Sequence, residues 1–448
     1  MMRSPTMIVG LDRARRFFDV FWGQAVVAVA TFAGIRLYTE LLTPAEFGHA
    51  ILAMGIVALL DSISGMALSQ TLLSRCGVHE DREHRRQLSI GLSWLLGQKV
   101  IRVAAFTAVL LAGAGLGGWI SPLLVAAPLA LGLYLLGEFA KHSLLTLLIL
   151  ERDYRRYSAW MAGEAILAFM CTALALVFWR SDSVGYIGGY LVSRIISTLL
   201  FISVFSAGRH LRRFDLTIAR NDAKEALLYG VPISFMGPLG WIATYLDRYV
   251  LGAMLGAAST GTYAAATGLV ARPYAMTTAV LSNYFRPLYY QPALDASGTG
   301  ERRRILRNWT IIAFAVGGVG ALAFAGLGGL IATIMLAPDY RAGASPLMAV
   351  FAISQTLAIA THSADNAVLA LRGSGILLKF QIALAVVTLV LVPLGIVMGG
   401  LLGGVIGRCL AETVKFGATA ILALRMIDHN ARAPLAEPLP PVVSAEGA

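Results

Sequence analysis

The chain has 448 residues, of which 57% are hydrophobic and 14% charged, and its formal net charge is +11. Soluble domains hold about a quarter charged residues, so this composition excludes an ordinary soluble protein. The pI near 9.8 does not indicate nucleic-acid binding, because the basic residues sit in short segments between apolar stretches, where they orient helices and meet anionic headgroups.

Apolar stretches of membrane-spanning length recur along the whole chain. A helix needs ~20 such residues to cross the hydrocarbon core, where the backbone must satisfy its own hydrogen bonds. The sequence therefore predicts an all-α polytopic membrane protein with about twelve transmembrane helices. The predicted spans are 20–41, 46–68, 99–118, 123–146, 158–179, 184–206, 226–248, 260–283, 309–336, 346–369, 378–399 and 402–424.

The connections between these spans alternate between strongly basic and almost charge-free. The basic set is the N-terminus, 75–86, 152–156, 209–224, 286–307, 372–379 and the tail. It holds 25 of the 36 Lys and Arg, whereas the other set holds only Arg180 and Arg341. Because basic loops stay in the cytoplasm, this pattern predicts a multi-pass protein with both termini in the cytoplasm.

The two halves of the chain look related. Arg36 lies near the outer end of the first span and is followed by a short connection that ends at Gly48, and Arg248 and Gly261 repeat this arrangement 212 or 213 residues later. Six spans separate the two units, so they share one orientation. We expect two pseudo-symmetric six-helix bundles. The expected segments are a bundle at 1–208, a cytoplasmic linker at 209–225, a bundle at 226–425 and a disordered cytoplasmic tail at 426–448.

Charges inside the predicted spans need a partner, water or a function, since insertion at mid-bilayer costs at least ~2.5–3.5 kcal/mol each. Arg36 with Glu40, and Glu138 with Lys141, are spaced to pair on one helix face. Three acids lack an obvious cation on their own helix, namely Asp61, Glu164 and Asp365. Two interpretations stay open for them: uptake of H⁺ or Na⁺ during a transport cycle, or pairing with an arginine of another helix.

Arginines could bind an anion inside the membrane. Arg272 lies deep in the eighth span beside Pro273, with no acid within four residues. It is either a cavity-lining anion ligand or a buried structural cation, and the proline is expected to kink the helix. Arg36 and Arg248 occupy equivalent places in the two halves. Since a guanidinium gives a phosphate two parallel hydrogen bonds, three arginines around one cavity would suit a diphosphate.

Two tyrosines of the eighth span, Tyr263 and Tyr274, are either interfacial anchors or rings that stack on sugars. The sequence has no Gly-x-x-x-x-Gly-Lys-Ser/Thr phosphate loop, no Gly-x-Ser-x-Gly elbow and no histidines at metal-ligand spacing. We therefore expect no enzyme activity, no cofactor and no metal site.

Several short motifs resemble the polysaccharide biosynthesis (O-antigen) flippases. This family belongs to the MOP exporter superfamily, together with the MATE drug exporters and the lipid II flippases. The resemblance covers about residues 18–425. The motifs are Arg36-Leu-x5-Thr-Pro-Ala-Glu-Phe-Gly48, Tyr229-Gly-Val-Pro232, Asp247-Arg248-Tyr-Val-Leu-Gly252 and Gly261-Thr-Tyr-Ala-Ala-Ala-x-Gly-Leu.

The resemblance implies a MATE-like pair of six-helix bundles around a central cationic cavity. It also implies ion-driven alternating access that carries an undecaprenyl-diphosphate-linked oligosaccharide across the bacterial inner membrane for O-antigen, capsule or exopolysaccharide synthesis. Arg36, Asp247 and Arg248 carry over from the motifs as site residues. Expected partners are the polyprenyl-diphosphate-linked glycan, the bilayer and a polysaccharide polymerase or glycosyltransferase.

Other functions predict different features. A MATE-type exporter of cationic drugs would have a cavity dominated by acids, whereas the mid-span candidates here include arginines. A membrane polymerase or ligase of lipid-linked glycans would carry a large outer loop with paired catalytic residues, and the predicted outer loops are short. A membrane scaffold would leave Arg272 and the repeat unexplained. Lipid II flippases usually have fourteen spans, against the twelve expected here.

Overall fold

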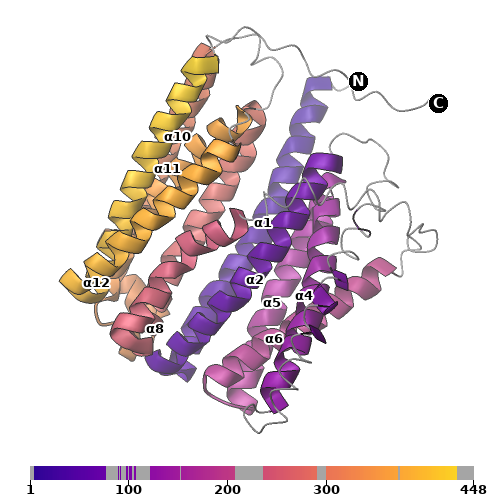
Figure 1. Cartoon of the computed structure of the whole chain (residues 1–448), viewed down its shortest axis with the longest axis vertical. Coiled ribbons are helices and arrows are strands. Elements are labelled where there is room, and N and C mark those ends of the chain that lie inside the picture. The colour runs from indigo at the N-terminus through magenta and orange to yellow at the C-terminus, as the bar shows by residue number, and fades with distance from the viewer. Residues whose placement is uncertain are drawn as a thin grey trace. The chain divides into compact units, whose positions relative to one another are not determined.

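The computed structural model describes residues 5–76, 89, 91, 97–98, 100–102, 105–106, 122–151, 153–206, 236–289, 299–371 and 374–430. These residues form helices and short connections (Figure 1). The elements are α1 (Pro5–Leu41), α2 (Pro44–Cys76), α4 (Pro122–Leu150), α5 (Tyr154–Phe178), α6 (Ser183–Ser206), α8 (Met236–Tyr289), α10 (Thr299–Met335), the 3₁₀ turn η1 (Pro338–Tyr340), α11 (Ala344–Ala370) and α12 (Ser374–Asn430).

The described helices match eleven of the twelve predicted spans, because α8 and α12 each contain two. Within the described residues, seven stretches are long and apolar enough to cross a membrane. The chain is an all-α polytopic membrane protein, as predicted. The third predicted span, 99–118, lies largely outside the described residues, and the linker 209–225 lies wholly outside them. Helix α12 continues to Asn430, five residues into the expected tail.

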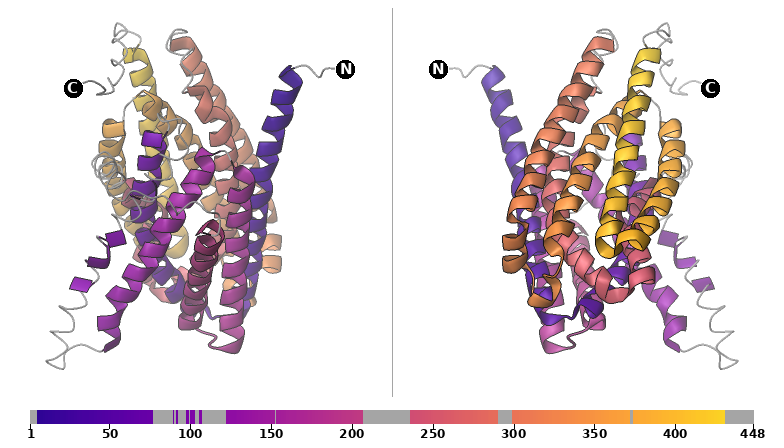
Figure 2. Two further views of the ribbon diagram at one scale, coloured as in Figure 1. Left: turned by 90° about the vertical axis from the view of Figure 1, so that its right-hand side faces the viewer. Right: turned by 90° about the vertical axis from the view of Figure 1, so that its left-hand side faces the viewer.

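Glycines form the corners at which α8 and α12 turn back on themselves. Gly256 has φ 84° and Gly400 has φ 56°, a region that residues with a side chain rarely adopt. Both corners lie in connections predicted to be short and charge-free. In α12 the two arms then approach so closely that a Cβ on Gly395 would collide with the carbonyl of Gly403, and Figure 2 shows the arms side by side.

The segment Thr43–Gly48 contains the N-cap and the first turn of α2. The Thr43 hydroxyl accepts a hydrogen bond from the Glu46 amide at 3.3 Å, as an N-cap residue does. Pro44 stands at the first helical position, where its missing N–H costs nothing. The Glu46 carboxylate in turn accepts the Ser183 amide at 2.8 Å and so joins the start of α2 to the start of α6.

The chain divides into two compact units, which are described separately. Unit 1 is Met1–Leu269 with Gly329–Ala344, and unit 2 is Val270–Gly328 with Ser345–Ala448. In unit 1, α5 packs against α1 and α6, and α2 packs against α4 (Figure 1). The expected bundle boundary at 209–225 stays a prediction, and the first part of α8 belongs to unit 1 by its packing.

Unit 1 contains a reciprocal contact between the two predicted repeats. A Cβ on Gly48 would collide with the carbonyl of Ala257, and a Cβ on Gly261 would collide with the carbonyl of Pro44. Each glycine thus meets the residue four positions before the other glycine. Self-complementary contacts of this kind are what a two-fold relation produces, and small residues let membrane helices approach this closely.

Unit 2 has an aromatic and hydroxyl core. Trp309 is fully buried and stacks on Phe285, with ring centroids 5.3 Å apart. The Thr310 and Ser363 hydroxyls share a hydrogen bond of 2.7 Å that joins α10 to α11. Phe314 meets Phe416 edge to face, which joins α10 to α12.

Candidate functional site

A cavity of about 300 Å³ lies inside unit 1, between α1, α2, α5, α6 and α8. Its walls are mostly small and aromatic residues. Among the lining residues that the structure describes, Arg248 is the one charged side chain. The aromatic members are Tyr38, Phe47, Phe169, Tyr186 and Tyr190.

These rings hold each other in place. Tyr186 meets Tyr38 edge to face at 5.1 Å and Phe47 at 6.0 Å, measured between ring centroids. The Tyr38 hydroxyl donates to the carbonyl of Phe169 at 3.3 Å. Since each ring is fixed by its neighbours, the cavity presents rigid apolar faces with a few polar edges, as small-molecule sites do.

Arg248 supplies the positive charge of this cavity. Its guanidinium carbon lies 4.8 Å from the centroid of the Tyr245 ring, a cation–π geometry. Its Nε is buried and has no hydrogen-bond partner among the described residues. A buried donor of this kind can bind an anion at little cost, because the unmade hydrogen bond is expensive.

Asp247 and Tyr263 lie behind Arg248 and not among the lining residues. Asp247 is 3% exposed, and its carboxylate accepts hydrogen bonds from the Tyr263 hydroxyl and, at 2.8 Å, from the Arg248 amide. Tyr263 is 1% exposed, so in this conformation its ring has no face for a sugar. This pair joins the two arms of α8 and positions Arg248.

Arg36 does not line the cavity. It pairs with Glu40 at 2.6 Å, as its i, i+4 spacing predicts, and both side chains are more than a third exposed. The structure therefore brings Arg248 but not Arg36 to the cavity wall.

A buried ion network adjoins the cavity. Arg194 of α6 forms an ion pair with Glu164 of α5 and a second with Asp61 of α2 at 3.2 Å. Lys141 of α4 contacts Glu138 at 2.7 Å and Glu164 at 2.8 Å. The pairing of Glu138 with Lys141 is confirmed, and Asp61 and Glu164 do pair with an arginine of another helix.

Among the residues that the structure describes, the network holds three carboxylates and two cations, Lys141 and Arg194, so one carboxylate is in excess within this set. Lys141 and Glu138 are 2% and 1% exposed, so the excess charge lies away from solvent. Tyr134 donates to Asp61 at 3.0 Å. Carboxylate oxygens of Asp61 and Glu138 and a ring nitrogen of His142 lie within 4.8 Å of one another. These groups can share a proton or hold a small cation.

Tyr190 connects the network to the cavity. Its ring lies under the Arg194 guanidinium, 5.2 Å from centroid to carbon, and it also lines the cavity wall. We did not expect Arg194, Glu138 and Lys141 to act with Asp61 and Glu164 as one cluster. The sequence did indicate that these five charged residues lie on four apolar spans. That they converge on one cluster is seen only in the fold.

The remaining predicted site residues lie in unit 2. Arg272 is half-buried on α8, which passes through Pro273 without a break, since Gly256 is the non-helical residue inside α8. The backbone dihedrals at Pro273 are therefore helical, and a bend of the helix axis there stays a prediction. Tyr274 is 4% exposed and donates to the Gly317 carbonyl at 2.7 Å. Asp365 accepts a hydrogen bond from Gln381 at 3.2 Å.

Comparison with known proteins gives consistent results. A family model described as polysaccharide biosynthesis protein matches residues 15–282. The succinoglycan biosynthesis transport protein ExoT of Rhizobium meliloti (strain 1021) is 23% identical over 86% of this chain and 74% of its own length. The lipopolysaccharide biosynthesis protein WzxC of Escherichia coli (strain K12) is 24% identical over 54% of this chain and 47% of its own length.

Solved structures resemble the whole chain. An inward-facing MATE family transporter of the MOP superfamily has a TM-score of 0.64 at 18% identity, over 92% of this chain and 96% of its own. The lipid II flippase MurJ in an inward closed conformation has a TM-score of 0.65 at 10% identity, over 93% and 92%. At such identities the likeness shows the fold alone, which is MATE-like as predicted.

Proposed function

Because this chain belongs to the polysaccharide biosynthesis protein family, we propose that it flips an undecaprenyl-diphosphate-linked oligosaccharide across the bacterial inner membrane. The translocated oligosaccharide would be used to synthesise a surface polysaccharide. A glycosyltransferase or a polysaccharide polymerase would act before or after the flipping step. Both termini would lie in the cytoplasm, as the distribution of basic loops predicts.

The observation that carries the proposal is the cavity in unit 1. Among the lining residues that the structure describes, its one charged side chain is Arg248. A fixed guanidinium with a buried donor suits a phosphate oxygen, and the surrounding rings suit the apolar faces of sugars. At about 300 Å³ the cavity is too small for a whole oligosaccharide, so it would hold the diphosphate and the first sugar. Arg36 and Arg272 are proposed as further cations for the substrate at other stages of transport.

The ion network supports coupling to a proton or sodium gradient. Arg194 of the network lies over the ring of Tyr190, and Tyr190 belongs to the cavity wall. Neutralising the excess carboxylate of the network would release Arg194 from one of its acids, Asp61 or Glu164, and let α6 shift against α2 and α5. Asp61 and Glu164 remain the proposed coupling residues, with Glu138 added, and Asp365 is a separate proposal in unit 2.

A MATE-type exporter of cationic drugs is the rival. It shares the fold, and a buried acid excess would serve it equally well. The charge at the cavity wall separates the two proposals, because an arginine there repels a cationic drug and attracts a diphosphate.

The test is to measure undecaprenyl-diphosphate oligosaccharide on each face of the inner membrane in a strain that lacks this protein. Wild type should relieve accumulation on the cytoplasmic face. Arg248→Gln should not, and Arg248→Lys should do so only in part, because the ammonium cannot give a bidentate contact. The control is Arg180→Gln, an exposed arginine paired with Asp182.

Full relief by Arg248→Gln, with protein amounts equal to wild type, would remove this arginine from the site. A strain without accumulation but with altered sensitivity to cationic dyes would favour the exporter.

A further inference from the structure

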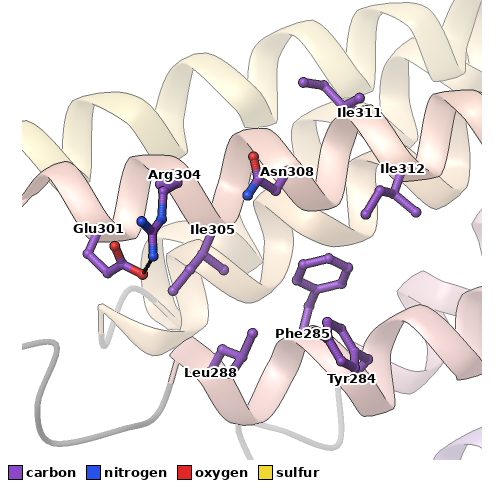
Figure 3. A pocket seen from close by; sticks show the side chains of 9 residues that line it. All are labelled: Tyr284, Phe285, Leu288, Glu301, Arg304, Ile305, Asn308, Ile311 and Ile312. Atoms are coloured by element: carbon purple, nitrogen blue, oxygen red, sulfur yellow. Dashed lines mark hydrogen bonds and ion pairs between the residues drawn. The ribbon is translucent and has the colours of Figure 1, made fainter.

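A second groove lies in unit 2, between the end of α8 and the start of α10, and has a volume of about 380 Å³ (Figure 3). Its floor and one wall are apolar. Phe285 and Leu288 of α8 face Ile305 and Ile312 of α10 across it. Ile311 and Tyr284 at its edge are 57% and 68% exposed, so the groove opens sideways toward lipid.

One end of the groove is polar. Arg304 and Asn308 lie one turn apart on α10, and Glu301 pairs with Arg304 at 2.7 Å (Figure 3). Arg304 is 62% exposed, so its remaining N–H groups can reach a ligand. The polar end lies in the segment 286–307, one of the basic connections that predict the cytoplasmic side.

The charge around this end is positive. Arg286, Arg302, Arg303, Arg304 and Arg307 stand on the two helix ends that form the groove. Among the residues that the structure describes, the acids paired with them are Glu301, which contacts Arg304, and Asp428, which contacts Arg303. Basic pockets between membrane helices on the cytoplasmic side attract anionic headgroups, at ~1 kcal/mol for each basic residue near the surface.

We propose that this groove binds an anionic phospholipid of the cytoplasmic leaflet, with its phosphate at Arg304 and Asn308 and an acyl chain along the Phe285–Ile312 wall. The size and lining favour a phospholipid over the glycan carrier. A single phosphate with glycerol fits beside one arginine and one amide, whereas a diphosphate with several sugars would need more polar partners than Glu301, Arg304 and Asn308 supply. The inference is independent of the flipping proposal and rests on the predicted cytoplasmic side of this loop.

The experiment titrates the full chain in detergent with phosphatidylglycerol or phosphatidylcholine and counts bound lipids by native mass spectrometry. Arg304→Gln should weaken phosphatidylglycerol binding about tenfold, the lower end expected for a lost charge-assisted hydrogen bond. Glu301→Gln should strengthen it, because the competing carboxylate is gone. Ile312→Trp should fill the groove and thereby weaken phosphatidylglycerol binding. The control is Arg155→Gln, an exposed arginine at the start of α5.

Equal losses for Arg304→Gln and Arg155→Gln would mean that lipids respond to overall charge, and the site would be rejected. Unchanged binding in Ile312→Trp would equally reject the groove. Displacement of phosphatidylglycerol by undecaprenyl phosphate at the same mole fraction would overturn the assignment to phospholipid and give the groove to the carrier lipid.

Discussion

Arg194 is the residue on which the buried part of unit 1 most depends. It contacts Asp61 and Glu164 directly, and its Nε lies 3.9 Å from the Glu138 carboxylate. Buried ion pairs contribute little net stability, but removing one partner leaves an uncompensated charge. The loss of Arg194 would remove the arginine that pairs with Asp61 and would leave Lys141 as the one described cation in contact with both Glu138 and Glu164.

Arg194→Gln should therefore lower the free energy of unfolding by ~3–5 kcal/mol, measured as a drop in thermal stability of the purified protein in detergent. Adding Glu164→Gln to this variant should restore part of the loss, because a buried acid is removed with the cation. Equal stability of the single and double variants would show that Arg194 does not compensate Glu164.

At the scale of elements, the reciprocal contact between the start of α2 and the second arm of α8 brings the two repeats close together in unit 1. Gly48 and Gly261 are both buried there, and the atoms that a side chain would meet are carbonyls, which cannot move aside as a flexible side chain can. Space, rather than backbone freedom, requires glycine at these positions.

Gly48→Ala and Gly261→Ala should each destabilise the protein by about 1–3 kcal/mol, as overpacking does. Thermal unfolding in detergent measures this. The control is Gly163→Ala in α5, where an added Cβ meets nothing within 4 Å, so that alanine should gain up to about 1 kcal/mol from helix propensity. A Gly48→Ala variant as stable as Gly163→Ala would disprove the tight packing.

The connection between α5 and α6 carries a pH-dependent cap. The Gly185 amide donates to the Asp182 carboxylate at 2.9 Å, and this hydrogen bond lowers the pKa of Asp182, with further help from Arg180. A depressed pKa means that the folded state gains stability above the unfolded pKa of about 3.9. That gain disappears as the pH falls through the folded value.

Asp182→Asn should consequently be less stable than wild type at pH 7, and the difference should shrink below about pH 4. Thermal unfolding at both pH values measures it. If the stability difference between wild type and Asp182→Asn is the same at both pH values, the cap depends on the shape of the side chain and not on its charge.

At the scale of the whole molecule, the chain passes between the two compact units at three places. These are Leu269 to Val270, Gly328 to Gly329, and Ala344 to Ser345. Pro273 removes the amide that would bond to the Leu269 carbonyl, two glycines stand at the second crossing, and Gly343 before the third has φ 72°. Each crossing thus coincides with a weak point of the backbone.

Gly329→Ala should slow transport several-fold, leave substrate binding near wild type and raise stability by no more than about 1 kcal/mol. An added Cβ there meets nothing within 4 Å, so the substitution acts through the backbone. Alanine favours the helical conformation over glycine by up to about 1 kcal/mol and so resists local opening of the helix. Single-turnover flipping in reconstituted vesicles measures the rate. Unchanged flipping would mean that motion between the units does not use this crossing.

The sequence predicts most of the helices because hydropathy and basic loops act locally. It also predicts pairs three or four residues apart, such as Arg36 with Glu40. It does not predict that Arg194 meets acids of α2 and α5, or that Tyr263 is buried against Asp247, because these contacts depend on how distant helices pack. The sequence also does not predict that α12 continues past residue 425, since a polar helix end resembles the start of a loop.

The excess carboxylate of the ion network also has an electrical consequence. A cation that travels from the cell surface to Asp61, Glu138 or Glu164 crosses part of the membrane potential, which is worth up to about 2.3 kcal/mol per elementary charge at 100 mV. Occupancy of the network would then depend on voltage as well as on concentration. Two cells with the same external pH but different membrane potentials would load this protein differently.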